Sequence, residues 1–142
     1  MKIQIYSFIL GIFTTHMQAG TSSLIQSSRY EQVMELKTFI NQKSRPNFKL
    51  IVAGDFNIDS RHSITDYNAL TSVLGLKDEL FSQFKQHPVT YLPWKARFNN
   101  KSIYTANLDY IFTSNVNVSI SIYSTTYNTS WKGLLYKYKL EM

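Results

Sequence analysis

The stretch LIVAGDFN, residues 50–57, constrains the fold most, because it changes from purely apolar to acidic in a single step. Its nearly continuous apolar part predicts a strand over residues 48–54 that is buried on both faces of a sheet. Asp55 and Asn57 follow directly, and residues two apart on an extended chain point the same way. The stretch therefore predicts a carboxylate and a carboxamide presented together at a strand end. The alternative is a simple turn, which both residue types favour.

The remaining pattern predicts a mixed α/β sheet with helices packed on it, in one domain spanning residues 1–142. Strands are predicted over residues 3–15, 108–112 and 116–123, and the tail from residue 131 alternates weakly. A helix is predicted from Ser23 to about residue 42, with Ser23 and Gln26 as a capping box. A second helix ends at Gly75, and residues 76–104 read as irregular. The 44% of hydrophobic residues favours a packed core over disorder.

The net charge and the cysteine content limit the classes of ligand and metal site that this chain can have. The net charge of +6 favours an anionic partner, such as nucleic acid, a phosphate ester or an anionic membrane surface, although solubility alone also explains it. The chain has no cysteine, which excludes disulfides and thiolate metal sites. Any metal ligands must therefore be oxygen atoms or imidazoles.

Polar residues cluster where apolar strands end. His16 follows the first strand, Asp55 and Asn57 follow the second, and Asp109 lies inside the predicted strand 108–112. A histidine in such a place can exchange a proton or bind an anionic oxygen, or it can be purely structural. An acid inside a strand is disfavoured, so Asp109 needs a partner. Because ligands gather at strand ends in α/β sheets, we predict that the three clusters meet.

Taken in order, these segments resemble the endonuclease/exonuclease/phosphatase superfamily, over roughly residues 12–113. The superfamily's Thr-His-x-Gln, Gly-Asp-x-Asn and Leu-Asp-Tyr-Ile blocks match residues 15–18, 54–57 and 108–111. The resemblance is closest to its sphingomyelinase-like branch, whose Arg-x-x-Gln-x-x-Glu-Leu helix is matched by Arg29, Gln32, Glu35 and Leu36. Tyr67 and the pair Thr90-Tyr91 fit that branch as well. The resemblance implies a two-sheet α/β sandwich that acts on phosphodiesters.

The resemblance also implies roles for the matched residues. His16 would contact the phosphate or assist the leaving group, and Asp55 would orient or activate the attacking water. Asn57 would stabilise the phosphorane-like transition state, so that Asn57 and His16 bind the substrate. Asp109 would orient a histidine general base. A divalent metal, normally Mg²⁺, would neutralise phosphate charge.

Two expected parts of the superfamily pattern are missing. A glutamate from the N-terminal half usually holds the metal, and residues 1–11 contain no acid, so the metal ligands stay unassigned. The general base comes from a Ser-Asp-His block, and no histidine follows Asp109. We therefore expect a partial domain of this type, a phosphoric diester hydrolase with little activity on its own. The alternatives are a nuclease of the same superfamily and a non-catalytic phosphate-binding pseudoenzyme.

Half of a two-sheet sandwich leaves apolar strand surface uncovered, which predicts self-association. Similar enzymes touch lipid through a late aromatic hairpin, and Trp131 is the matching residue, the alternative being an ordinary edge strand or tail. The first residues imitate a signal peptide, with an apolar run after Lys2, but polar interruptions favour a strand. Similar enzymes are secreted, and the sequence leaves the location of this chain undetermined.

Overall fold

The computed structural model describes residues 9–91, 104–114, 117–126 and 132–141. The elements in chain order are β1 (Leu10–His16), α1 (Ser23–Lys43), β2 (Lys49–Asp55), α2 (Ile64–Leu74), β3 (Lys77–Asp78), α3 (Glu79–Phe84), β4 (Asp109–Ser114), β5 (Asn117–Thr126) and β6 (Lys132–Glu141). The strand predicted over residues 3–15 is β1 in its second half, while residues 3–8 and the proposed lipid-contacting Trp131 lie outside the described residues. No helix in the described ranges combines the length and the apolar character needed to cross a membrane.

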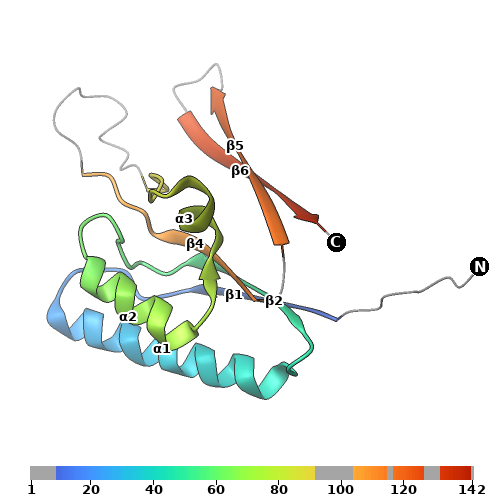
Figure 1. Cartoon of the computed structure of the whole chain (residues 1–142). Coiled ribbons are helices and arrows are strands. Elements are labelled where there is room, and N and C mark those ends of the chain that lie inside the picture. Colours follow the sequence, from blue (N-terminus) through green and yellow to red (C-terminus); the bar gives the residue numbers. More distant parts are fainter. Residues whose placement is uncertain (1–8, 92–103, 115–116, 127–131, 142) are drawn as a thin grey trace, which may run out of the picture.

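The main sheet is mixed, as predicted, with the strand order β1-β2-β4-β3. β1 and β2 run parallel, whereas β4 is antiparallel to both of its neighbours, β2 and β3. A separate antiparallel hairpin, β5–β6, extends away on the side of the sheet opposite α1 (Figure 1). The predicted proximity of the strands that carry Asp55 and Asp109 is confirmed, because β2 and β4 are hydrogen-bonded partners.

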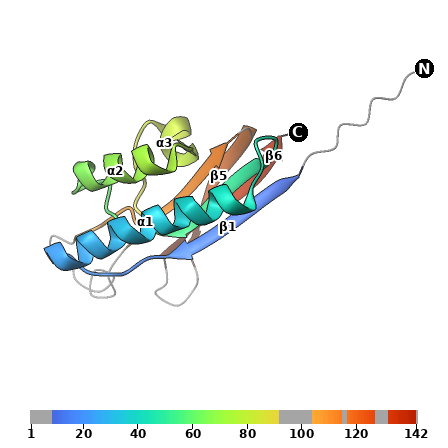
Figure 2. The ribbon, with the colours of Figure 1, turned by 90° about the horizontal axis from the view of Figure 1, so that it is seen from below.

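Helices α1 and α2 cover one face of this sheet, and the core lies between them and the strands (Figure 2). Val33 and Ile40 of α1 are buried against Val52 of β2 and Phe112 of β4. Phe56 follows β2 and meets the Phe112 ring edge to face, with ring centroids 5.3 Å apart. The core therefore fixes β2 and β4 together directly beneath the end where the polar clusters lie.

The opposite face of the sheet is far less covered, so the expectation that β2 is buried on both faces is wrong. Val52 alone in β2 is fully buried, since alternate side chains of a strand point to opposite faces and only one face carries α1 and α2. On the other face, Ile12 of β1 is 62% exposed. The self-association expected from such a surface stays a prediction.

Two local predictions from the sequence differ from the structure. The N-cap of α1 is Ser22 and not Ser23, because it is the Ser22 side chain that accepts a hydrogen bond from the Ile25 amide. The segment after Gly75 is not irregular throughout, since it contains β3 and α3. Asp78 belongs to both elements. Its backbone pairs with β4, and its carboxylate caps α3 by accepting a hydrogen bond from the Phe81 amide. Gly75 itself ends α2 in the left-handed conformation, as predicted.

Candidate active site at the strand ends

His16, Asp55 and Asp109 form one row across three neighbouring strands. The register pairs His16 with Asp55 and Asp55 with Asp109. Directly opposite residues on paired strands project to the same face, so the three side chains share one side of the sheet. The His16 Nε2 atom lies 3.6 Å from Asp55 Oδ2. We refer to these three residues as the polar row.

Asn57 joins this row through a bend and not through extended geometry, which corrects the expectation for the pair Asp55 and Asn57. Strand β2 ends at Asp55, and the chain bends after it: Asn57 has a φ of +52°, in the left-handed region. The Asn57 amide donates to Asp55 Oδ1 at 2.8 Å, which is the turn that Asp favours. The Asn57 carboxamide nitrogen donates to Met17 O at 2.8 Å, so Asn57 ties the end of β2 to the residue after His16.

Asp109 begins β4 and is exposed, so it does not lie inside the strand as predicted. The hydroxyl oxygen of Thr90 accepts hydrogen bonds from the Leu108 and Asp109 amides and so positions this carboxylate. Desolvation raises the pKa of Asp109 above its usual value and outweighs the lowering by the Thr90 hydrogen bond, while the Asp55 carboxylate raises this pKa by a smaller amount and His16 lowers it least. The two carboxylates of the polar row therefore repel each other.

We expect Asp109→Asn to raise the midpoint of thermal unfolding at pH 7 in metal-free buffer. Because the pKa of Asp109 is raised in the folded chain, its ionisation opposes folding, and the neutral amide removes that cost. The gain should shrink as the pH falls through the raised pKa, where Asp109 itself is protonated. Circular dichroism melts between pH 7 and pH 3 measure this, with the exposed Glu31→Gln as the charge control. A variant no more stable than the parent chain at pH 7 contradicts the prediction.

Two of the four matched helix residues on α1 hold the loop that follows His16. Arg29 Nη1 donates to the carbonyl oxygens of Gln18 and Gly20, at 3.0 Å and 2.6 Å. Gln32 Oε1 accepts from the Gln18 amide at 3.0 Å. Arg29 and Gln32 both bind the backbone of this loop, because residues three apart lie on the same face of a helix. Arg29 and Gln32 position the chain directly after His16.

A second group of polar side chains, which the sequence analysis missed, lies around Asp59. The Asp59 carboxylate is 9% exposed and accepts hydrogen bonds from the Arg61 and Asn107 amides and the Tyr104 hydroxyl. His62 Nδ1 lies 2.6 Å from Asp59 Oδ2. Desolvation raises the pKa of Asp59, but these hydrogen bonds outweigh it, and the net pKa is below the usual value. The only sequence signal was the i, i+3 spacing of Asp59 and His62 in a polar loop.

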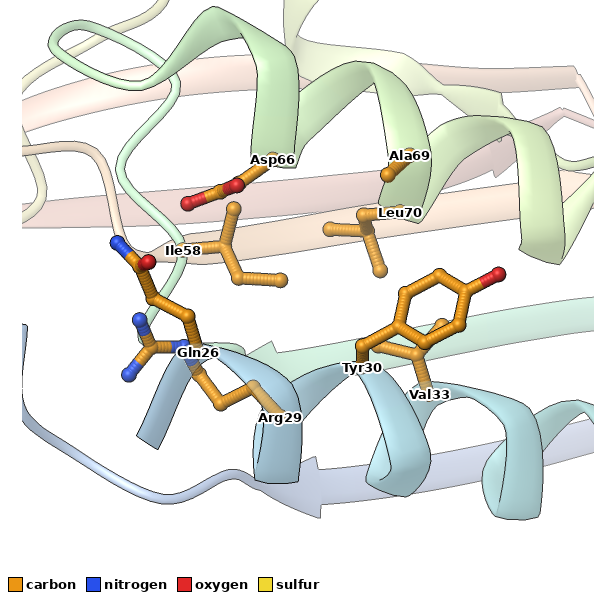
Figure 3. Close-up of a pocket in the computed structure, with 8 residues that line it drawn as sticks. All are labelled: Gln26, Arg29, Tyr30, Val33, Ile58, Asp66, Ala69 and Leu70. Atoms are coloured by element: carbon orange, nitrogen blue, oxygen red, sulfur yellow. The ribbon is translucent and has the colours of Figure 1, made fainter. Parts of the chain in front are cut away.

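This group borders a cleft of about 440 Å³ at the ends of β1 and β2. We call it the loop cleft, and its walls include Arg29, Asn57, Asp59, His62, Tyr91 and Tyr104. A smaller hollow of about 40 Å³ lies between α1 and α2 and shares Arg29, Gln26 and Asp66 with it (Figure 3). His16, Asp55 and Asp109 do not line the loop cleft, whereas Asn57 does, so Asn57 lies between the cleft and the polar row.

The polar row fits a divalent metal in part. Mg²⁺ prefers oxygen ligands and is commonly held by one or two carboxylates plus water and substrate phosphate. Asp55 and Asp109 provide two carboxylates on one face, and their mutual repulsion is what a cation relieves. Within the described residues, no group of three or more His, Asp or Glu side chains is placed to hold a metal ion. Any metal here would rest on these two carboxylates.

Comparison with solved structures shows the fold that these elements form. Beta toxin from Staphylococcus aureus superimposes with a TM-score of 0.61 and 18% identity, covering 88% of this chain and 48% of that chain. Sphingomyelinase C from Streptomyces griseocarneus gives a TM-score of 0.56 and 18% identity, with coverages of 89% and 48%. TDP2 of D. rerio, complexed with a single-strand DNA product, gives a TM-score of 0.59 and 16% identity, covering 85% of this chain and 50% of that chain.

These proteins share the endonuclease/exonuclease/phosphatase-type fold, and this chain has the same fold, as the resemblance implied. The chain spans about half the length of each of them. A further beta toxin structure contains bound magnesium ions. No model of a known protein family matches the sequence, and no curated protein sequence matches it either.

Proposed function

We propose that this chain is a sphingomyelinase-like phosphoric diester hydrolase by type, which binds the phosphate group of a phosphodiester at the polar row and Asn57. The observation that carries the proposal is the register that aligns His16, Asp55 and Asp109 on one face of neighbouring strands. Solved structures with this fold include a sphingomyelinase C and a TDP2 bound to a DNA product, which supports a phosphodiester as the ligand class.

Each residue has a distinct part in this proposal. The His16 imidazole is largely exposed, at 74% of its side chain, and can donate to a phosphate oxygen. The Asn57 carboxamide nitrogen carries two N–H bonds, and donation to Met17 O leaves one for a ligand. Asp55 would orient a water molecule. A divalent metal held by Asp55 and Asp109 would neutralise charge on the phosphate.

Binding without turnover is the second candidate function. Asp55, Asp109 and His16 are the acidic and histidine side chains at the polar row, and no group of three or more such side chains is placed to hold a metal ion within the described residues. The chain also has no histidine after Asp109 to act as the general base that this aspartate orients in similar enzymes. This favours a site that recognises phosphate more strongly than it transforms it. A lipid headgroup is the preferred source of that phosphate, and the net charge of +6 keeps nucleic acid as the alternative.

The test is a titration of the ¹⁵N-labelled chain with phosphocholine in the presence of Mg²⁺, followed through the histidine ring signals. The chain has only three histidines, His16, His62 and His87, so each ring is a separate reporter. We expect weak binding, with a dissociation constant of about 1 mM, and a saturable shift of the His16 signals. Asp55→Ala combined with Asn57→Ala should abolish that shift. A short oligonucleotide that shifts His16 at lower concentration than phosphocholine would favour the nuclease alternative, and an unresponsive His16 ring contradicts both.

A further inference from the structure

Residues 85–91 connect the end of α3 to the polar row. Near the end of this segment the Thr90 amide donates to Ala106 O at 2.9 Å, which fastens it to the chain before β4. The Thr90 hydroxyl oxygen accepts from the Leu108 and Asp109 amides at 2.9 Å and 3.1 Å. A hydrogen bond from this hydroxyl also lowers the pKa of Asp109. The position and the ionisation of Asp109 therefore depend on where the segment holds Thr90.

His87 fixes the middle of this segment. Its ring stacks on the Phe81 ring of α3, with centroids 4.6 Å apart, and meets the Tyr67 ring of α2 edge to face at the same centroid distance. Its carbonyl oxygen accepts from Arg61 Nη1 at 2.9 Å. Only two residues, one of them a proline with a fixed φ, separate His87 from Thr90. A displacement of His87 is therefore passed on to Thr90.

The surroundings of the His87 ring suit its neutral form. Its Nδ1 atom is buried and has no hydrogen-bond partner among the described residues, so a proton there would be donated to no acceptor. Desolvation lowers the pKa of His87 most, and Asp78 raises it by a smaller amount. Arg61 lowers this pKa further, and Asp59 raises it least. The Asp78 carboxylate already accepts from the Tyr67 hydroxyl at 2.9 Å, which limits what it can offer an imidazolium.

The sign of the resulting pH dependence follows from the lowered pKa. A histidine that is harder to protonate in the folded chain opposes the folded arrangement once it gains a proton. The stability of the packing around His87 is fully present above the ordinary histidine pKa of 6.5. It is lost as the pH falls from that value through the lowered pKa of His87. The contacts that depend on this packing should loosen over the same range.

We propose that His87 is a positioning residue for the polar row, because its neutral ring holds Thr90 against Asp109 and its protonation in mildly acidic solution releases Thr90. The release removes the hydrogen bond that helps to keep Asp109 ionised, so the polar row loses one of its two carboxylate charges. The movement of Thr90 is argued from the contacts of residues 85–91. Only its consequence for ligand binding rests on the proposed function.

The test follows the Leu108 and Asp109 amide signals of the ¹⁵N-labelled chain between about pH 8 and about pH 5, without metal or phosphate. We expect both signals to shift with the midpoint of the His87 ring, below 6.5. His87→Phe places an uncharged ring between Tyr67 and Phe81 and should remove this shift. His87→Gln cannot be protonated either, and it repeats the test should the larger ring not fit. Circular dichroism checks that both variants keep the parent fold.

The other two histidines provide the matched controls. His16→Gln and His62→Gln each remove one titrating ring and leave His87 in place. The amide shift with the His87 midpoint should persist in both. A shift that disappears with His16→Gln, or one that remains in both His87 variants, overturns the proposal.

Phosphocholine titrations with Mg²⁺ separate this proposal from the proposed function. Between about pH 7.5 and about pH 5.5, the affinity of the parent chain should fall at least about fivefold more than that of His87→Phe. Equal changes in the two chains overturn the link between His87 and the polar row. An absence of binding in both chains contradicts the proposed function instead, and the amide titration then still decides whether His87 controls Thr90.

Discussion

Replacing Gly54 with alanine is expected to lower the free energy of unfolding by at least about 3 kcal/mol. Gly54 has a φ of +146°, and a Cβ atom there would lie 2.0 Å from the carbonyl oxygen of Thr15. That oxygen belongs to the backbone of β1, so the clash is relieved only by separating β1 from β2. Urea unfolding of the two chains, followed by circular dichroism, measures the difference.

Gly75→Ala is the matched control. Gly75 also has a positive φ, of +62°, but its new Cβ would meet nothing closer than Lys37 Nζ at 3.8 Å. The cost there is limited to backbone strain of about 1 kcal/mol. Equal losses in the two variants would contradict the clash at Gly54. The glycine of the Gly-Asp-x-Asn block thus has a packing role, since it allows the close strand approach that sets His16 beside Asp55.

The second large effect concerns turnover. We expect the 142-residue chain with Mg²⁺ to show no measurable hydrolysis of sphingomyelin, a simple phosphodiester or DNA. Losing one preorganised electrostatic contact typically costs about 10²- to 10³-fold in rate. Both the acidic metal ligand and the general-base histidine of the superfamily pattern are missing from this sequence, so the two losses should combine. The assay compares the purified chain with the Asp55→Ala, Asn57→Ala double variant.

Robust magnesium-dependent turnover that the double variant abolishes would contradict this expectation. It would mean that another residue of the chain supplies the base. His62 would then be the first residue to replace, because Asp59 orients its ring beside the same loop that carries Asn57. His87 is a poorer candidate, since burial lowers its pKa and its Nδ1 atom is enclosed without a partner among the described residues.

Some of the site could be predicted because it depends on local patterns. An apolar run that ends in an acid places Asp55 at a strand end wherever the strand lies in the sheet. The periodicity of Val33 and Ile40 likewise set the buried face of α1. The three motif blocks then identified the polar row, because their residues follow strands that such a fold brings together. These inferences needed only the period of each element and the order of the elements.

Other features depended on contacts between distant segments. The exposed face of β2 follows from which side α1 and α2 cover, and the apolar run itself is the same for one covered face or two. The Asp59 group joins residues 45 and 48 positions apart in the chain, through Tyr104 and Asn107, which no local period connects. The loop cleft arises in the same way, because its walls come from segments far apart in the chain. The sequence by itself determined which residues end each strand, and the tertiary structure decided which of them face a common ligand, because side-chain direction and burial are set by packing across the chain.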